Sequence, residues 1–546
     1  MEDKLWFKSW PEDVPKTINY EHKKPIDYLQ LMARRYPLRI AITTPSESLT
    51  YQELLTKVEK FSYGLNRLGL GKDDRIGISL TNCAEFAISF YATLNIGAIA
   101  VLIDPTDTPP TFKRKVSESE PEAIITHDYL FPKHKAVLKE KIAILVKRNN
   151  YFKTSSLFED LIIKLKVWYT AFFEDPRTIV FFDEVIKSKP NFWDSNVKVH
   201  MDDTACVLYS VGSKGIRFSH HDLSIGAQQV TQWTKLTQKD SILSIFPLTK
   251  SFGLSFCLNL PLTIGSKSIL MPSNNIKTVL KMIQKYRPTI FIGTSGIYED
   301  LVNFPDLEKY NLSSFKHSFT IDKMAEEVQE KFEQKIGTRL IEAYALTETS
   351  TIQCSNLLTH GRQDSIGIPL PDVEMKIVDL DNYTKELPPN EIGEILIKSP
   401  SLMKGYWDPK ESLRKIQKDW FLTGDVGKMD EDGFFYIFNK KWDIIKTDIG
   451  TILPKEVEGI INSHPAVLES AIVGIKHNEM HYIIAGIRLK NHVLLNPEEI
   501  IEHCSNNLKD YQVPDYVYFV DELARAENGR LARQKIKAVL RSKLTN

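Results

Sequence analysis

Cysteine is scarce in this sequence. The 546 residues include five cysteines, an odd number, and they lie far apart in the chain. The sequence contains no Cys-x-x-Cys pair and no cluster of histidine and cysteine. These absences argue against a disulfide-rich secreted domain and against a structural zinc site, and they indicate reduced thiols in a reducing compartment.

Long apolar runs and net charge are missing too. No segment reaches the about 18 uninterrupted apolar residues that a membrane span needs, and the N-terminal segment MEDKLWFKSWPEDVPKT lacks the apolar core of a signal peptide. The 70 basic and 70 acidic residues cancel, so no global field attracts nucleic acid or an anionic membrane. We therefore expect a cytoplasmic protein that does not bind nucleic acid.

The sequence does contain a regular alternation of strand-like and helix-like segments. Thr50 and Glu53 form a capping box at the start of a predicted helix. Residues 75–80 and 98–105 have the pattern of buried strands and flank a second helix-like stretch. This alternation predicts an α/β fold with a mostly parallel sheet covered on both faces, which binds ligands beyond the carboxyl ends of its strands.

The pattern changes further along the chain. Residues 157–173 fit an amphipathic helix that either packs on the body of the protein or serves as a lid or membrane-surface contact; its polar side has only two lysines, which favours packing. After residue 365, shorter strands and turns predict a small β-rich lobe. A chain of this length needs about two to four cores, and we predict domains at 1–438 and 439–546.

One turn has the composition of a phosphate-binding loop. An apolar, strand-like run enters the segment LYSVGSKGIRFSH, and the turn within it contains Gly212, Ser213, Lys214 and Gly215. Backbone N–H groups in such a turn converge on an anion, and the lysine adds a full positive charge. Short turns of this composition also occur without any ligand, so the remaining segments have to decide its function.

Several further segments occur in an order that is typical of one superfamily. They are LTYQELLTKVEKFSYGLNRLGLGKDDRIGISLTNCAEF, YSVGSKGIRFSH, FPLTKSFGL, YALTETS, GEILIKSPSLMKGYWDP, FLTGDVGKMDEDGFFYI, KKWDIIK and YQVPDYVYFVDELARAENGR. With these segments the chain resembles the adenylate-forming (AMP-binding) superfamily of acyl-CoA synthetases, peptide-synthetase adenylation domains and luciferases. It is most similar to the fatty acyl-CoA synthetase branch.

The resemblance implies both a fold and a reaction. The fold is α/β, with a large N-terminal domain of two parallel-rich sheets covered by helices, a small β-rich lobe, and a small mobile α+β C-terminal domain. In the reaction, a carboxylic acid, here a medium- or long-chain fatty acid, attacks the α-phosphate of ATP to give an acyl-adenylate and pyrophosphate, and CoA then takes the acyl group. The expected ligands are therefore ATP, Mg²⁺, CoA and a small-molecule acid, because such chemistry needs neutralised phosphates.

Positions that match the motifs of the superfamily take on its roles by resemblance. Tyr344 is expected against the adenine, Thr347 at the α-phosphate, and Glu348 as the ligand of Mg²⁺. Asp425 matches the carboxylate that accepts hydrogen bonds from both ribose hydroxyls. Lys214 is expected to contribute its charge to the phosphates.

A second group of positions matches the motifs less closely. Asp443 and Lys446 match the hinge about which the small domain rotates. Asp322 stands where a glycine pair usually passes close to adenine, so its side chain would crowd the base. Lys440 replaces an arginine by a point charge. Candidate residues of the acyl pocket are Lys250, Ser295 and Ala345.

Three departures put catalysis in question. The phosphate loop keeps Lys214 but lacks residues that usually supply hydroxyl and N–H groups. Arg530 replaces the adenylation lysine; it keeps the charge on a planar, bulkier group. Ile449 stands where a glycine normally lets the pantetheine arm of CoA pass.

These departures leave three hypotheses open. The first, which we favour, is an ATP-dependent acyl-CoA synthetase that works with altered site residues. The second is an impaired family member that binds nucleotide, an acyl ligand or a partner without turnover, since each lost charge-stabilising donor costs about 10²–10³ in rate. The third is an enzyme that forms the acyl-adenylate but not the thioester.

Overall fold

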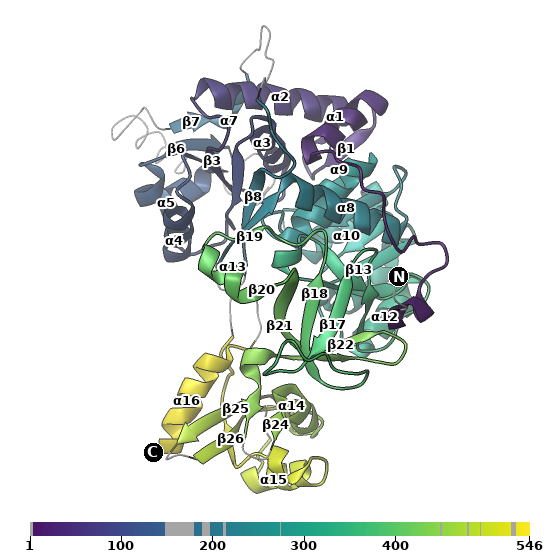
Figure 1. Ribbon diagram of the computed structural model, residues 1–546, viewed down its shortest axis with the longest axis vertical. Helices are drawn as coiled ribbons and strands as arrows, with labels where there is room; N and C mark the ends of the chain where they lie inside the picture. Colours follow the sequence, from purple (N-terminus) through teal and green to yellow (C-terminus); the bar gives the residue numbers. More distant parts are fainter. Residues whose placement is uncertain are drawn as a thin grey trace. The chain divides into compact units, whose positions relative to one another are not determined.

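The computed structural model describes residues 4–147, 179–187, 197–210, 214–272, 275–447, 450–477, 480–491, 493–525 and 531–545. The chain forms two compact units (Figure 1). The first comprises Met1–Glu374, Ile397–Phe421 and Asp432–Phe434, and the second Met375–Leu396, Leu422–Glu431 and Phe435–Asn546. The helix predicted at 157–173 lies outside the described residues, and the predicted boundary after residue 438 stays a prediction.

One sheet of the first unit runs in the order β19-β9-β8-β4-β3-β5-β6-β7. The strands from β8 to β7 in this order pair in parallel, whereas β8-β9 and β9-β19 are antiparallel. The strands are β3 (Arg75–Ser79), β4 (Ile99–Leu102), β5 (Ala123–His127), β6 (Ile142–Val146), β7 (Ile179–Phe181), β8 (Thr204–Tyr209), β9 (Gly215–Ser219) and β19 (Gly405–Tyr406). The helices between or beside them are α2 (Tyr51–Arg67), α3 (Ala84–Asn95), α4 (Pro109–Ser119), η2 (Asp128–Leu130), α5 (Phe131–Leu138), α7 (Phe182–Ile186) and α13 (Pro409–Lys415).

A second run of paired strands in this unit has the order β16-β15-β14-β13-β12-β10-β11-β1-β2. Its central pairs are parallel, and β1-β2, β14-β15 and β15-β16 are antiparallel. The strands are β1 (Ile40–Thr43), β2 (Ser48–Thr50), β10 (Ser241–Ser244), β11 (Lys267–Leu270), β12 (Ile290–Ile292), β13 (His317–Thr320), β14 (Leu340–Ala345), β15 (Ile352–Ser355) and β16 (Ser365–Pro369), and the short β20 (Ile416–Gln417) pairs with β21. The helices are η1 (Leu5–Ser9), α1 (Pro25–Arg35), α8 (His220–Thr234), the π-helix η3 (Gly253–Asn259), α9 (Leu260–Ile264), α10 (Ile276–Tyr286), α11 (Ser295–Val302), η4 (Leu307–Lys309), α12 (Glu326–Ile336) and η5 (Thr347–Thr349).

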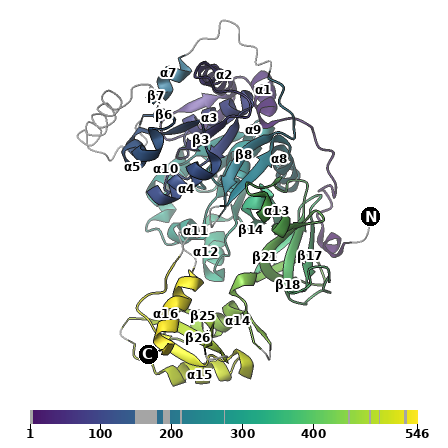
Figure 2. The same cartoon turned by 60° about the vertical axis from the view of Figure 1, so that its left-hand side comes forward.

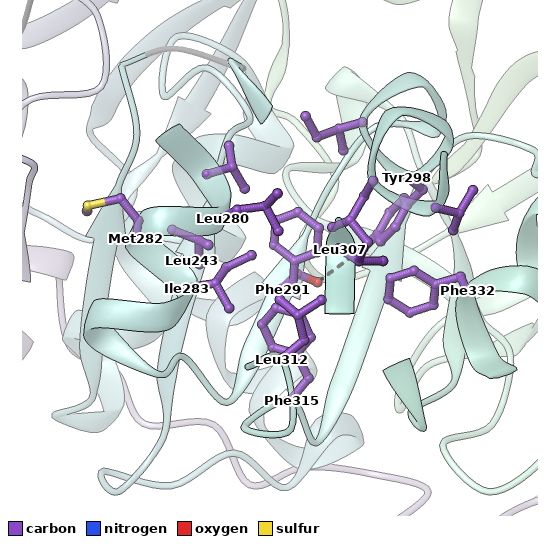
Figure 3. Packing of buried hydrophobic residues seen from close by; sticks show 14 of the residues in the cluster. Leu243, Leu280, Met282, Ile283, Phe291, Tyr298, Leu307, Leu312, Phe315 and Phe332 are labelled. Carbon is purple, nitrogen blue, oxygen red and sulfur yellow. Dashed lines mark hydrogen bonds between the residues drawn. The ribbon is translucent and has the colours of Figure 1, made fainter. Parts of the chain in front are cut away.

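An apolar core fixes the helices to this second sheet. Leu280 and Ile283 recur at helical spacing on α10 and are buried with Phe291 of β12 (Figure 3). The ring of Phe291 stacks on Phe315 at 5.4 Å and meets the edge of Tyr298 of α11 at 5.3 Å. Each buried side chain of this size contributes about 1.5–3 kcal/mol, so this core holds the strand ends in place.

Asn82 connects the carboxyl ends of the two sheets. It follows β3, and its Nδ2 donates to the carbonyl O of Phe246, in the loop after β10, at 2.8 Å. Its Oδ1 accepts from the N–H of Leu248 at 2.9 Å. The ligand-binding edges of two parallel sheets, which lie at the carboxyl ends of their strands, are therefore side by side in the first unit.

The second unit contains the strand order β17-β18-β21-β22, the hairpin β23-β24 and the sheet β25-β26-β27. The residues of β25 alternate in the environment that they face. Val473 and Ile475 pack with Leu540 of α16, whereas Ile472 packs with Val457 of α14. Figures 1 and 2 show α16 and α14 on opposite sides of β25 and β26.

The elements of the second unit have the following bounds: β17 (Glu374–Val378), β18 (Gly393–Lys398), β21 (Trp420–Met429), β22 (Phe435–Lys440), η6 (Lys441–Asp443), β23 (Ile445–Lys446), β24 (Thr451–Ile452), α14 (Pro454–Asn462), β25 (Val467–His477), β26 (Met480–Leu489), α15 (Pro497–Ser505), η7 (Asp510–Gln512), β27 (Tyr516–Phe519) and α16 (Arg533–Thr545). The predicted α/β fold of a large domain with parallel-rich sheets followed by a small domain is confirmed. No helix in the described part of the chain is long and apolar enough to cross a membrane.

Candidate active site

The predicted phosphate loop connects β8 to β9, and one helix holds both of its ends. Tyr209, the last residue of β8, donates its hydroxyl hydrogen to the backbone O of Lys115 in α4 at 2.9 Å. After the loop, the N–H of Gly215 donates to Oε1 of Glu118, also in α4, at 3.3 Å. Burial raises the pKa of Glu118. The loop is therefore anchored at both ends on α4.

Gly215 lies where the chain leaves little room for a side chain. A Cβ at this position would lie 3.0 Å from Cβ of Trp407 and 3.1 Å from Oε1 of Glu118. Both distances are tighter than ordinary contacts, and Trp407 also donates its N–H to the carbonyl O of Gly215 at 2.6 Å. The glycine thus allows β9 to lie close to β19 and α4.

The ammonium of Lys214 contacts two side chains from another part of the first unit. It forms an ion pair with Glu411 of α13 and lies 5.6 Å from the centre of the Tyr406 ring in β19. Tyr406 reaches this place because β19 pairs with β9, with Tyr406 opposite Ile216. About half of the Lys214 side chain is exposed (47%), so an incoming anion has access to it.

Tyr406 links this lysine to the predicted magnesium ligand. Its hydroxyl donates to Oε1 of Glu348 at 2.8 Å, and the carbonyl O of Glu348 accepts from the N–H of Met403 at 2.9 Å. Burial, and then the charge of Glu348, raise the pKa of Tyr406, which therefore stays a hydrogen-bond donor. The structure brings Lys214, Tyr406 and Glu348 together, with Thr347 in the same short helix η5 as Glu348.

The backbone next to η5 has an unusual conformation. Ser350 has φ 63°, a region that non-glycine residues seldom adopt. Its carbonyl O accepts from the hydroxyl of Ser255 in the π-helix η3 at 2.6 Å. Such strained residues persist where surrounding contacts hold them and are frequent at functional sites, which fits the place of Thr347 and Glu348 in the preceding turn.

Tyr344 and Ala345 end β14, directly before η5. Tyr344 is buried, with 7% of its surface exposed. Two residues earlier, the carboxylate of Glu342 accepts from the N–H of Met324 at 2.7 Å, and burial raises the pKa of Glu342 to about 7. The predicted adenine residue therefore lies beside a carboxyl group that titrates near neutral pH.

Asp322 and Ser295 meet at the start of α11. Oδ2 of Asp322 accepts from the N–H of Ser295 at 3.0 Å, and the N–H of Asp322 donates to Oγ1 of Thr320 at 3.1 Å. A carboxylate at a helix N-terminus is stabilised by the free N–H groups there. The structure thus gives Asp322 a local role in capping α11, and its predicted contact with the adenine stays a prediction.

Lys250, the third predicted residue of the acyl pocket, forms an ion pair with Asp104, the residue that follows β4 by two positions. The Nζ to Oδ2 distance is 3.2 Å, and the lysine side chain is 43% exposed. Burial of Asp104 opposes its ionisation, but Lys250 and Thr106 outweigh that effect and lower its pKa. The positive charge of Lys250, at the carboxyl edge of the first sheet, is therefore already balanced by Asp104.

The predicted nucleotide residues of the second unit form ion pairs within that unit. Asp425 and Lys440 are opposite each other in β21 and β22, and their side chains are 2.7 Å apart. Asp425 is 3% exposed. Lys446 pairs with the exposed Asp381. Asp443 lies in η6; burial raises its pKa although Arg533 lies 3.5 Å away.

Four positions named in the sequence analysis lie outside the described residues: Gly212, Ser213, Ile449 and Arg530. Conversely, three residues that the structure places in the site were not predicted: Glu118, Tyr406 and Glu411. Tyr406 stands inside the segment MKGYW that carried part of the resemblance, so that motif contained a signal. Glu118 and Glu411 are surface-type residues in helices, and no local pattern distinguishes them.

The described residues contain no group of three or more His, Cys, Asp or Glu side chains that could enclose a metal ion. Mg²⁺ does not require such a cage, because it is usually held by one or two carboxylates together with substrate phosphates and water. Glu348, oriented by the hydroxyl of Tyr406, fits this requirement.

Comparison with known families identifies the family to which the chain belongs. A family model described as AMP-binding enzyme matches residues 29–407, and one described as AMP-binding enzyme C-terminal domain matches residues 456–530. The chain belongs to the AMP-binding enzyme family. Tyr344, Glu348, Tyr406 and the anchored loop at Lys214 all lie within the first match.

Full-length relatives place this AMP-binding enzyme in the acyl-CoA synthetase branch. It is 31% identical over 552 residues to a long-chain-fatty-acid–CoA ligase of Bacillus subtilis, with 98% of this chain and 97% of the ligase covered. A ligase of the same name from Yersinia pestis is 28% identical, with 98% of both chains covered.

Solved structures agree on the fold. An anthranilate CoA ligase in complex with anthranoyl-AMP superposes with a TM-score of 0.79 at 24% identity, covering 95% of this chain and 97% of that one. A benzoate CoA ligase from Burkholderia xenovorans gives 0.78 at 23% identity, covering 94% and 100%. The family models and the curated ligases show the family, and the predicted membership of the adenylate-forming superfamily is confirmed.

Proposed function

We propose that this AMP-binding enzyme is an acyl-CoA synthetase for medium- or long-chain fatty acids. The carboxylate of the acid attacks the α-phosphate of ATP, a P–O bond to the β-phosphate breaks, and pyrophosphate leaves. The thiol of CoA then attacks the acyl carbon and releases AMP. The single observation that carries the proposal is the Lys214–Tyr406–Glu348 group beside an anchored loop, at the joined carboxyl ends of two parallel sheets.

In this proposal the first unit supplies the charges for the phosphates. Lys214 binds the phosphates of ATP, and Thr347 contacts the α-phosphate. Glu348 holds Mg²⁺, which when bound neutralises phosphate charge. Tyr406 fixes the carboxylate of Glu348 through the hydrogen bond of 2.8 Å, and Tyr344 packs against the adenine.

The second unit is proposed to bind the ribose through Asp425 and to change position during the cycle. Asp425 is buried and forms an ion pair with Lys440, and its carboxylate oxygens are acceptors that suit the hydroxyls of a ribose. Asp443 and Lys446 are proposed as the hinge, and the domain boundary is proposed after residue 438. Arg530 is proposed to approach the carboxylate that is being activated.

The choice of acid is supported by the long-chain ligases that the chain resembles along almost its whole length. Lys250, Ser295 and Ala345 are proposed to line the acyl pocket. Consistent with small-molecule substrates, we propose a cytoplasmic location.

A second candidate function is favoured by specific residues. Arg530 replaces a lysine, and the phosphate loop is shortened. An enzyme with these changes could bind ATP or an acyl ligand without turnover. Ile449 favours a third outcome, in which the acyl-adenylate forms and is not passed to CoA.

One assay separates these functions. Pyrophosphate release is measured with ATP, Mg²⁺ and a panel of medium- and long-chain acids, first without and then with CoA, while acyl-AMP and acyl-CoA are quantified. The synthetase predicts acid-dependent pyrophosphate and acyl-CoA, whereas accumulating acyl-AMP that CoA does not discharge indicates loss of thioester formation. No pyrophosphate with any acid would contradict the proposal and support binding without turnover.

Matched variants test the site itself. Glu348→Gln removes the charge of the proposed magnesium ligand and keeps its shape, and we expect a loss of about 10²-fold or more in rate. Glu327→Gln, which removes an exposed carboxylate paired with Lys331 on α12, is the control and should match the wild type. Equal activity of the two variants would refute the assignment of Glu348.

A further inference from the structure

Glu411 is in direct contact with the proposed phosphate-binding lysine, although no predicted role involves it. It lies in the first turn of α13, 197 positions beyond Lys214 in the chain. Oε2 of Glu411 pairs with the ammonium of Lys214, while its Oε1 lies 3.2 Å from Nη1 of Arg414. The carboxylate is thus shared between one cation of the site and one exposed cation of its own helix.

We propose that Glu411 is a positioning residue that sets the affinity of the site for phosphates. Its carboxylate holds the Lys214 ammonium when no phosphate is bound and must release it when ATP or pyrophosphate binds. This inference rests on the proposed function, in which Lys214 binds the phosphates. It assigns Glu411 the role of a competitor for that lysine.

The geometry supports competition. The ammonium of Lys214 lies over the Tyr406 ring at 5.6 Å, and the hydroxyl of the same tyrosine bonds to Glu348. Lys214 and the carboxylate proposed to bind Mg²⁺ therefore contact the same tyrosine, one at its ring and the other at its hydroxyl. A triphosphate that binds Lys214 would have to displace the carboxylate of Glu411 from an ammonium that is already paired.

The charge of Glu411 weakens the binding of phosphates to Lys214 in two ways. The hydrogen bond from Lys214 lowers the pKa of Glu411, so the carboxylate is ionised at neutral pH and competes fully. It also repels the negative charge of the phosphates directly, and salt screens this repulsion because the site is open to solvent. Both effects weaken the binding of ATP and of pyrophosphate together.

The size of the effect follows from the exposure of the pair. The side chains are 47% and 23% exposed, and ion pairs this exposed are weak. Removing the competitor should therefore tighten phosphate binding about 1.5- to fivefold at low ionic strength. Tight retention of pyrophosphate would slow its release, so a weakening contact of this kind favours turnover.

The test compares equilibrium binding of ATP with Mg²⁺, and of inorganic pyrophosphate, to the full chain and its variants. Glu411→Gln should lower both dissociation constants by about 1.5- to fivefold, and the gain should shrink as salt is raised. Glu411→Asp retains a charge and should stay closer to the wild type. Glu327→Gln, the charge-matched control on α12, should leave both constants unchanged.

A double variant isolates the lysine. Lys214→Met should weaken binding, and adding Glu411→Gln to it should give a smaller gain than in the wild-type background, because only the direct repulsion remains. Equal or weaker binding by Glu411→Gln than by the control would overturn the proposal. A wild-type chain that releases no pyrophosphate with any acid refutes the proposed activity, while the binding comparison still decides the role of Glu411.

Discussion

The pair of Arg533 and Glu458 is expected to hold the second unit together. Arg533 begins α16, and its Nη2 lies 2.8 Å from Oε2 of Glu458 in α14. Its Nη1 contacts Oε1 of the same carboxylate and the carbonyl O of Ile472 in β25, and the N–H of Ile472 donates to Glu458 at 2.7 Å. The two side chains are only 11% and 8% exposed. The perturbation is Glu458→Gln, which keeps the shape and removes the charge.

The expected cost follows from these contacts. Removing one partner of a buried ion pair costs about 3–5 kcal/mol, because the other charge stays buried without compensation. Asp443 lies 3.5 Å from Nε of Arg533 and compensates in part, so we expect a loss of about 3 kcal/mol in the free energy of opening of this unit. That corresponds to a factor of about 10² in an equilibrium constant.

Hydrogen exchange on the full chain measures this loss. Peptides from β25 and α16 should exchange about 10²-fold faster in Glu458→Gln, provided their amides exchange through opening of the small sheet. The control is Glu469→Gln, whose partners Arg488 and Arg525 are 44% and 51% exposed. For this control we expect exchange to be at most about fivefold faster than in the wild type. If Glu458→Gln changes protection no more than this control, the buried pair does not stabilise the unit.

Three further predictions concern the first unit. Glu342→Gln should remove a pH dependence of stability. Burial raises the native pKa of Glu342 to about 7, so between about pH 4.5 and 7 the folded state binds a proton that the unfolded state has lost. The free energy of unfolding of the wild type therefore falls as pH rises through this range, by at most about 1.4 kcal/mol per pH unit. Thermal unfolding of both proteins across that range checks this. Tyr406→Phe removes a hydrogen bond to the charged carboxylate of Glu348, so the Mg²⁺ concentration for half-maximal pyrophosphate release should rise about tenfold. An unchanged Mg²⁺ titration would show that Tyr406 does not influence metal binding. Lys115→Met breaks an ion pair with Asp107 in which the side chains are only 4% and 8% exposed. The free energy of unfolding, measured in urea, should fall by about 3–5 kcal/mol. Adding Asp107→Leu to Lys115→Met should restore most of this loss.

Local signals in the sequence predicted the start of helix α2. The capping box forms, with the N–H of Glu53 donating to Oγ1 of Thr50 at 3.2 Å and the N–H of Thr50 donating to Glu53 at 2.8 Å. Both groups lie within one turn, so four consecutive residues determine the geometry. The strand predicted at 75–80 appears as β3 for the same reason, since its apolar pattern is continuous.

Other features depend on partners that are distant in the sequence. Strand β10 ends at Ser244 although the apolar pattern continues, and Phe246 beyond it bonds to Asn82, 164 positions earlier in the chain. Glu118 and Glu411 have helical patterns that are typical of solvated surface residues. The pairing of β9 with β19, which contacts α13, brings Glu411 close to Lys214, and a single sequence contains no periodicity that reports this pairing.

The pattern of charges in the site affects how its affinity should be interpreted. In the first unit, the two lysines that are proposed to meet a ligand, Lys214 and Lys250, already have carboxylate partners. The pairs are Lys214 with Glu411 and Lys250 with Asp104. A ligand anion therefore exchanges partners with these lysines and adds no ion pair to the total. The free energy of binding is then a difference between two sets of pairs, so substitutions of Glu411 and Asp104 should change affinity in the opposite direction to substitutions of Lys214 and Lys250.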